Sequence, residues 1–237
     1  MVIRERLDTQ SWVPSWIRHQ HVARYEWARS YCGANRVLDA ACGNGYGSRI
    51  LGSSGRVVGA DLATEAIVDG LDHLAETPLM VADTTALPFR DGQFDVFVSF
   101  ETIEHVQDDK AYVSEARRVL AKSGWFLCST PNRRLVNPNN TLADAPFNPH
   151  HLREYDAGEL HRLLERSFSQ VTMMGQTAYG DRYVGALAAV GRVSARGAVR
   201  LHQLRKLGGM PFDSRKRHEP QTIAAGFEPE VLIAVCQ

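Results

Sequence analysis

The sequence predicts a doubly wound α/β fold, in which a mainly parallel sheet carries helices on both faces. Short apolar runs alternate along the chain with segments of helical periodicity, as expected for strands buried on both faces. The run at 37–41 also leads directly into a Gly-rich turn, Cys42–Gly47, which opens helical sequence. Because ligands of such sheets bind beyond the carboxyl ends of the strands, we expect the functional residues at those ends.

Each element is expected from its own local signal. Residues 1–14 show no periodic pattern, whereas the spacing of apolar residues predicts a helix over 15–31. Strands are expected at 37–41, 57–61, 79–82, 94–100, 125–129, 170–174 and 231–236. Further helices are expected at 46–51, at 64–74 with Thr64 as N-cap, at 108–120 with Ser123 and Gly124 as a stop, and at 156–165, where Asp156 and Glu159 form a capping box. A long loop is expected over 132–150.

Length and composition limit the classes of protein. A chain of 237 residues suits one α/β domain with an insertion, and 44% apolar residues can fill one large core. Zero net charge gives no overall field toward nucleic acid or membrane. The four cysteines lack C-x-x-C spacing, which argues against a zinc site and a disulfide framework. We see no signal peptide and no apolar run near the ~18 residues of a membrane span, so we expect a cytoplasmic protein.

Roughly fifty residues, at about 178–227, separate the last two expected strands. Within 182–217, nine Lys and Arg residues stand against one acid, Asp213, and part of the segment has an apolar stripe at helical spacing. This pattern predicts a basic helical insertion inside a single domain that spans 1–237. The insertion is a solvated amphipathic helix, a substrate lid or an oligomer contact, and the last of these implies a homodimer.

The Gly-rich turn carries the first functional signal. Gly43 and Gly45 lack a Cβ, so the backbone can take positive φ and a ligand can lie against it. Amides at the start of the following helix point toward such a ligand. Asp39 lies inside the preceding strand, and Asp61 ends the next one. An acid about 20 residues beyond a Gly turn is placed to accept both hydroxyls of a ribose.

The stretch Leu38–Gly45 (LDAACGNG) resembles motif I of the class I S-adenosylmethionine (SAM) dependent methyltransferases. The resemblance covers about 24–166 and the last strand. Dinucleotide-binding Rossmann proteins usually show G-x-G-x-x-G with no acid inside the strand, so Asp39 favours the methyltransferases. The resemblance implies SAM as cofactor and a Rossmann-like seven-stranded sheet of order 3-2-1-4-5-7-6 with the seventh strand antiparallel.

The resemblance also implies how SAM is held. The methionine end meets the Gly turn, where Asp39 orients the ammonium, and Arg24 and Tyr25 of the preceding helix help to close over it. Residues 82–84 border the adenine amino group, apolar side chains at 62 and 87 enclose the ring, and Phe100 borders the sulfonium. Tyr25 as a core anchor and Asp83 as a simple turn residue are the alternatives. The expected cofactor-binding residues are Tyr25, Asp39, Gly43, Gly45, Asp61, Leu62, Asp83, Thr84 and Phe100.

Residues beyond the strand at 94–100 suggest the chemistry of the acceptor site. Glu101, Glu104 and His105 lie within five residues at a strand-to-helix bend. A second cluster at 148–155, with two neighbouring histidines, follows the fifth strand and so lies at the same sheet edge. Oxygen ligands with one imidazole suit Mg²⁺ or Mn²⁺ better than a structural zinc. The expected metal ligands are Glu101, Glu104, His105 and His151.

The E-x-x-E-H pattern with a later histidine resembles the metal site of small-RNA 2′-O-methyltransferases and of metal-dependent ubiquinone-biosynthesis O-methyltransferases. In those families one Mg²⁺ chelates two acceptor oxygens and lowers the pKa of the hydroxyl to be methylated. The 148–155 segment resembles N-P-aromatic-H-hydrophobic-R-E-aromatic in methyltransferases of glycan and natural-product pathways, where His151 is the matching histidine. The expected catalytic residues are His150, His151 and Glu104, with the general-base role open between the histidines. In the alternative interpretation, Glu104 and His105 only cap the next helix.

The resemblance therefore implies a Mg²⁺-assisted SAM-dependent O-methyltransferase acting on a sugar, a glycan or another small-molecule diol. The alternatives are an RNA 2′-O-methyltransferase, a metal-free N- or O-methyltransferase with a histidine base, and a SAM- or NAD-binding protein without activity. RNA binding usually needs basic residues interleaved with aromatic ones. The basic part of the insertion, 182–217, contains only two aromatic residues, Tyr183 and Phe212, so we expect a saccharide or small-molecule partner and no nucleic acid.

Overall fold

The computed structural model of the chain describes residues 15–52, 56–72, 77–177, 220–223 and 229–237. Its strands are β1 (Arg36–Ala40), β2 (Arg56–Asp61), β3 (Leu79–Val81), β4 (Phe94–Phe100), β5 (Leu120–Pro131), β6 (Val171–Gln176), β7 (Gln221–Thr222) and β8 (Val231–Cys236). Its helices are α1 (Ser15–Cys32), α2 (Tyr46–Gly52), α3 (Thr64–Leu71), α4 (Asp109–Val119), α5 (Arg133–Val136) and α6 (Ala157–Leu164), with a 3₁₀ turn, η1 (Ile103–His105).

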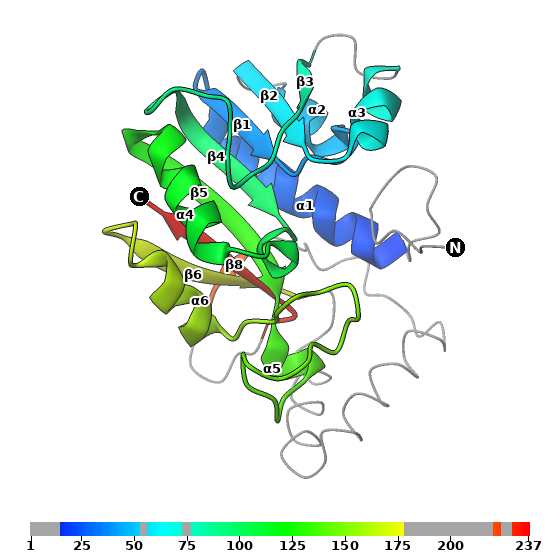
Figure 1. Cartoon of the computed structure of the whole chain (residues 1–237), viewed down its shortest axis with the longest axis vertical. Coiled ribbons are helices and arrows are strands. Elements are labelled where there is room, and N and C mark those ends of the chain that lie inside the picture. Colours follow the sequence, from blue (N-terminus) through cyan, green and yellow to red (C-terminus); the bar gives the residue numbers. More distant parts are fainter. Residues whose placement is uncertain (1–14, 53–55, 73–76, 178–219, 224–228) are drawn as a thin grey trace.

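These strands form one eight-stranded sheet of order β3-β2-β1-β4-β5-β8-β6-β7 (Figure 1). The first five strands are parallel, and β8 runs antiparallel between β5 and β6. The predicted order is confirmed, with β8 as the predicted seventh strand. The difference is β7, a two-residue strand that extends the edge beside β6.

Side-chain alternation along the strands builds a core on each face of the sheet. Leu38 and Phe97 point into a cluster that α4 and α6 cover, whereas Val37 and Val96 point into a cluster that α1 and α2 cover. Figure 1 shows α4 and α6 lying along the half of the sheet that contains β5 and β6. Strands with apolar side chains on both faces need helices on both, as the sequence predicts.

The ends of three elements differ from expectation. Ala63, not Thr64, is the N-cap of α3, and the Asp61 carboxylate accepts a hydrogen bond from the Ala63 amide. Ser123 and Gly124 do not stop a helix, because β5 already begins at Leu120. The segment predicted as a loop from residue 132 begins with the short helix α5, which the Asn132 side chain caps. At the start of β5, the pairing of Leu120 with Phe94 of β4 outweighs the local stop signal, whereas the other two differences come from contacts within two residues.

Other local predictions are confirmed. The capping box of Asp156 and Glu159 is present at the start of α6, and the helix predicted from residue 108 is α4, whose N-cap is Asp108. None of the helices in the described part of the chain combines the length and hydropathy needed to cross a bilayer. Nearly all of the predicted insertion at 178–227 lies outside the described residues, except 220–223, which include β7.

The parallel strands bring distant segments together at one edge. β1, β2, β3, β4 and β5 all end there, so the Gly turn, residues 61–63, residues 82–87, η1 and the segment after β5 are neighbours. These segments carry the residues singled out in the sequence.

Candidate functional site

The Gly turn after β1 has the conformation that its glycines allow. Gly43 and Gly45 have φ of 60° and 77°, in the left-handed region. A Cβ on Gly43 would meet no atom within 4 Å, so the backbone borders open space. Asp61 accepts hydrogen bonds from the Gly43 amide at 2.8 Å and from the Ala63 amide at 2.8 Å. One carboxylate thus joins the ends of β1 and β2, and its remaining lone pairs can accept from a ribose.

Asp39 lies under the turn and is fully buried. Its two oxygens accept from the Tyr25 hydroxyl at 3.1 Å and from the Ser48 hydroxyl at 2.6 Å. Burial raises the pKa of Asp39 to about 7, although both hydrogen bonds oppose the shift. Asp39 therefore connects α1, β1 and α2, and its predicted effect on an ammonium acts through the turn.

Tyr25 is a buried anchor between α1 and α2. Its ring meets Tyr46 and Phe100 edge-on, with centroids 5.6 Å and 5.1 Å away. A Cβ on Gly47 would overlap the same ring. This packing supports the core-anchor alternative for Tyr25 and leaves the ring beside the predicted sulfonium neighbour, Phe100.

Arg24 places a buried cation beside the turn. Its side chain is 1% exposed, and the guanidinium carbon lies 5.8 Å from the Phe100 ring centroid. Nη1 donates to Gln176 at 2.9 Å, and Nη2 lies 3.7 Å from the Glu101 carboxylate. Within the described residues, its Nε has no hydrogen-bond partner. A buried guanidinium with an unused donor fits an anionic group such as the carboxylate of SAM.

The predicted adenine region has apolar and polar parts. Leu62 is 67% exposed beside Asp61, and Leu87 is buried. Asp83 accepts from the backbone amide and hydroxyl of Thr85, and these hydrogen bonds lower the pKa of its carboxyl. Asp83 thus forms a local turn, as in the alternative interpretation, while Leu62 offers an uncovered apolar surface. Thr84, beside it, is buried.

Three of the four predicted metal ligands come together. Glu104, His105 and His151 each offer a ligand atom, and these atoms lie within 4.8 Å of one another. The two rings meet edge-on with centroids 5.0 Å apart. Burial, and then the nearby Glu101, raise the pKa of the Glu104 carboxyl well above its ordinary value. A buried acid beside two imidazoles fits a divalent cation, although two nitrogen donors make this set richer in nitrogen than predicted.

Glu101 lies outside this group. Its φ of 52° is left-handed, and its Oε1 accepts from the Ser129 hydroxyl at 2.7 Å. The same oxygen faces Arg24. The structure therefore pairs Glu101 with the cation of α1 and does not bring it into the group of ligand atoms.

The loop 147–154 reaches the end of β4 through backbone contacts. The Glu104 carbonyl accepts from the Leu152 amide at 2.8 Å, and the His105 Nδ1–H donates to the His150 carbonyl at 3.0 Å. Arg153 forms an ion pair with Asp109 at 2.7 Å. These contacts confirm that the two polar clusters share one sheet edge. The His150 side chain is exposed, and its carbonyl is the part that contacts His105.

Sequence reasoning missed two residues of this loop, Asn148 and Glu154. Glu154 is 3% exposed and accepts from His151 Nδ1 at 3.1 Å and from the amides of Phe147 and Asn148. Burial opposes ionisation, but these hydrogen bonds outweigh it and hold the pKa of Glu154 below its ordinary value. Asn148 Nδ2 lies 3.0 Å from His151 Nε2. The N-P-x-H-x-R-E spacing contained both residues, but nothing in it showed that they contact the histidine.

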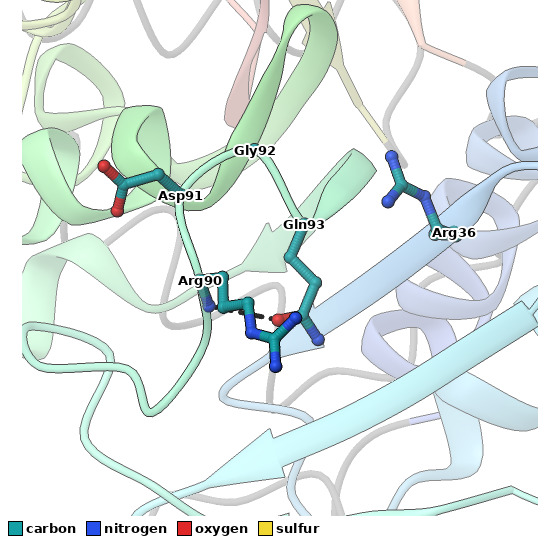
Figure 2. A pocket seen from close by; sticks show the side chains of 5 residues that line it. All are labelled: Arg36, Arg90, Asp91, Gly92 and Gln93. Carbon is teal, nitrogen blue, oxygen red and sulfur yellow. Dashed lines mark hydrogen bonds between the residues drawn. The ribbon is translucent and has the colours of Figure 1, made fainter.

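A cavity of about 430 Å³ lies away from this edge. It is lined by Arg36 and by the turn Arg90–Gln93, in which Gln93 lies nearest to Arg36 (Figure 2). Arg36 begins β1 and Gln93 precedes β4, so the cavity lies at the amino ends of the strands. Arg36 is already paired with Asp95 at 2.7 Å. The cavity is therefore not part of the candidate site.

Comparison with known proteins agrees with the geometry. Residues 38–128 match the family model described as a methyltransferase domain. A probable S-adenosylmethionine-dependent methyltransferase of Mycobacterium tuberculosis is 37% identical over 162 residues, which are 68% of this chain and 58% of that protein. This chain thus matches less than two thirds of that relative's length. A ubiquinone biosynthesis O-methyltransferase of Cereibacter sphaeroides is 37% identical over 103 residues, 41% of this chain and 42% of that protein.

A solved structure shares the fold at low identity. A SAM-dependent methyltransferase from Thermotoga maritima, described as a possible histamine N-methyltransferase, has a TM-score of 0.65 and 13% identity, covering 94% of this chain and 92% of its own. The sequence matches, the strand order and the acids around the Gly turn together show that the chain belongs to the class I SAM-dependent methyltransferases.

Proposed function

We propose that this protein is a SAM-dependent O-methyltransferase that methylates a hydroxyl of a sugar, a glycan or another small-molecule diol. One observation carries the proposal: the sheet edge that presents the Gly turn also presents the group formed by Glu104, His105 and His151. A cofactor site and a set of proton-accepting or metal-binding side chains at one edge are what methyl transfer to a hydroxyl requires.

The chain's own residues would hold SAM as follows. Asp61 accepts from the ribose while it keeps the Gly turn in place, and Arg24 binds the carboxylate of the methionine end. Leu62 packs against the adenine ring, and Phe100 borders the sulfonium. SAM supplies a methyl group that the sulfonium has already activated. The protein's remaining task is to orient the acceptor and to remove its proton.

At the acceptor side, Glu104, His105 and His151 are proposed to hold a divalent cation, Mg²⁺ or Mn²⁺. Such a cation would act as a Lewis acid and lower the pKa of a bound hydroxyl. With the cation bound, His150 takes the proton of the acceptor; without a cation, His150 or His151 is the general base. Glu101, ion-paired with Arg24, is not assigned as a ligand. Two neighbouring oxygens suit a chelating cation, which is the reason for preferring a diol.

Two alternatives have specific support. The relatives named ubiquinone biosynthesis O-methyltransferases favour oxygen as the methylated atom, and a phenolic ring in place of a sugar. The hydrogen bond from His151 to the buried Glu154 resembles the carboxylate–imidazole pairs of metal-free enzymes, in which the imidazole is the general base. RNA 2′-O-methylation stays a third candidate because of the E-x-x-E-H pattern.

Transfer of labelled methyl from SAM to a panel of saccharides, catechols, simple phenols and short RNAs tests the proposal. We expect product with a sugar or a catechol, loss of turnover in EDTA and recovery with Mg²⁺ or Mn²⁺, at constant SAM affinity. Glu104→Ala and His151→Ala should each lower the rate by orders of magnitude without unfolding. Full activity in EDTA would show that the reaction needs no metal ion and would leave a histidine as the general base. Tighter binding of NAD than of SAM would contradict the methyltransferase activity itself.

A further inference from the structure

Two imidazoles of the candidate acceptor site have defined proton positions. A carbonyl and a carboxylate only accept hydrogen bonds, so the nitrogen that faces one of them must carry the proton. His105 Nδ1 faces the His150 carbonyl at 3.0 Å, and His151 Nδ1 faces Glu154 Oε1 at 3.1 Å. In both rings the lone pair that can take a proton or a metal ion is therefore on Nε2.

The position of Glu154 is fixed well enough to keep the proton of His151 on Nδ1. The side chains of His151 and Glu154 are 6% and 2% exposed, so water does not compete for their contact. The carboxylate also accepts from the amides of Phe147 and Asn148 at 3.1 Å and 3.2 Å. These backbone bonds fix the carboxylate in the loop, and the carboxylate then fixes the ring.

Asn148 gives independent support for the same proton position. Its Oδ1 accepts from the His150 amide at 3.1 Å, which directs its NH₂ group toward His151 Nε2, 3.0 Å away. An NH₂ group only donates, so Nε2 must be the accepting nitrogen. The contacts on the two ring nitrogens thus agree.

We propose that Glu154 is a positioning residue that acts through His151, keeping the proton on Nδ1 and the lone pair on Nε2. The inference deepens the proposed function, since it says how the loop prepares one imidazole of that site. A carboxylate behind an imidazole orients the ring and raises its strength as a ligand or base. The Asn148 side-chain N–H donates to the Nε2 lone pair of His151, and a metal ion or the proton of the acceptor would replace this hydrogen bond.

The chain offers a matched control. Glu165 faces His161 Nδ1 at 3.2 Å on the surface of α6, where the two side chains are 52% and 41% exposed. Glu165→Gln removes the same type of Glu–His contact away from the site. It should leave both the proton position of His151 and the rate unchanged.

Nitrogen-15 correlation spectra of the histidine rings in the full chain test the proposal without any acceptor. The His151 signals are identified by their loss in His151→Ala. We expect the Nδ1–H tautomer of His151 in the wild type and in Glu154→Asp, which keeps a carboxylate. We expect the Nε2–H tautomer or a mixture in the double variant Glu154→Leu with Asn148→Ala, which removes both the oxygen that accepts from Nδ1 and the amide that donates to Nε2. A pure Nδ1–H tautomer in that double variant overturns the proposal. An Nε2–H tautomer in the wild type overturns the proposal even if the double variant does not fold.

The rate gives a second measurement once the panel identifies an acceptor. Glu154→Gln should lower kcat roughly 10- to 100-fold, the usual effect of losing such a partner, with unchanged Kd for SAM. In a His151→Ala background the same change should cost nothing further. A further loss there overturns action through His151. Failure to find any acceptor contradicts the proposed function, while the ring spectra still decide the role of Glu154.

Discussion

Asp61 illustrates at the scale of a single residue how one carboxylate serves both the fold and the site. It fixes the Gly turn by accepting from the Gly43 amide, and it begins α3 by accepting from the Ala63 amide. Its predicted contacts with ribose hydroxyls add to these two bonds. The turn is therefore in its binding conformation before a ligand arrives, which lowers the entropy lost on binding.

Asp61→Ala should weaken SAM binding by about 1–3 kcal/mol, because charge-assisted hydrogen bonds to the ribose are lost. Titration calorimetry measures the effect. Asp72→Ala, at the exposed end of α3, is the control and should leave the Kd unchanged. If Asp61→Ala and the wild type bind SAM with equal affinity, the ribose does not contact Asp61.

Asp39 predicts a pH dependence of stability. Its pKa in the folded chain, about 7, is above the ordinary value of 3.8, so the folded state binds this proton more tightly than the unfolded state does. Its contribution to stability is therefore full below about pH 4 and is lost as the pH rises toward 7. Asp39→Asn removes this loss. The Tm of the variant minus that of the wild type should be larger at pH 8 than at pH 5. Equal differences at the two pH values would contradict a raised pKa of the buried Asp39 carboxyl.

At the scale of elements, the contact between α1 and α2 supports the Gly turn from below. Tyr25 of α1 packs where Gly47 of α2 has no side chain, and both helices cover one face of the sheet. The turn thus depends on the helix that precedes β1 in the chain.

Gly47→Ala should destabilise the fold by about 1–3 kcal/mol, because its Cβ would overlap the Tyr25 ring. It should also weaken SAM binding by moving α2. Urea unfolding and calorimetry measure the two effects. Gly52→Ala is the control, since its Cβ would come no closer than 3.7 Å to another side chain. Equal stability of the two variants would show that α1 moves aside without cost.

A second element-scale prediction concerns the segment after β3. Glu115 of α4 accepts from the Leu87 amide at 2.7 Å, and Arg118 donates to the Leu87 carbonyl at 3.0 Å. Glu115→Ala should raise the KM for SAM with little change in kcat, because the wall of the adenine region is loosened. Steady-state kinetics with varied SAM separates the two constants. A fall in kcat alone would assign this segment to the acceptor side.

At the scale of the whole molecule, the parallel sheet brings together residues from very distant parts of the chain. The buried guanidinium of Arg24 in α1 contacts both Glu101 after β4 and Gln176 at the end of β6. The pairing of β5, β8 and β6 is made entirely by described residues. The sheet is thus complete without the segment at 186–207.

Deleting residues 186–207 should therefore leave SAM affinity nearly intact and change acceptor binding or the oligomeric state. Calorimetry with SAM and light scattering measure the two properties. Loss of SAM binding together with loss of cooperative unfolding would show that the segment belongs to the core.

The sequence by itself determined most of the strands and helices and the sheet edge that carries function. Apolar runs, the Gly turn and the acids Asp39 and Asp61 are local signals, and ligands of parallel sheets bind beyond the carboxyl ends of the strands. The order of the strands followed from the resemblance of Leu38–Gly45 to motif I of the methyltransferases. The capping box of α6 was also predicted from local signals, because a cap depends on residues within one turn of the helix.

Only the tertiary structure decided which polar groups meet. Glu101 and Glu104 are three residues apart, yet the turn at η1 directs Glu101 toward Arg24 and Glu104 toward the two histidines. The roles of Glu154 and Asn148 also depend on how the loop 147–154 folds back on η1. Such contacts join side chains that no local periodicity relates, so their geometry follows from packing and from the need to satisfy buried polar groups.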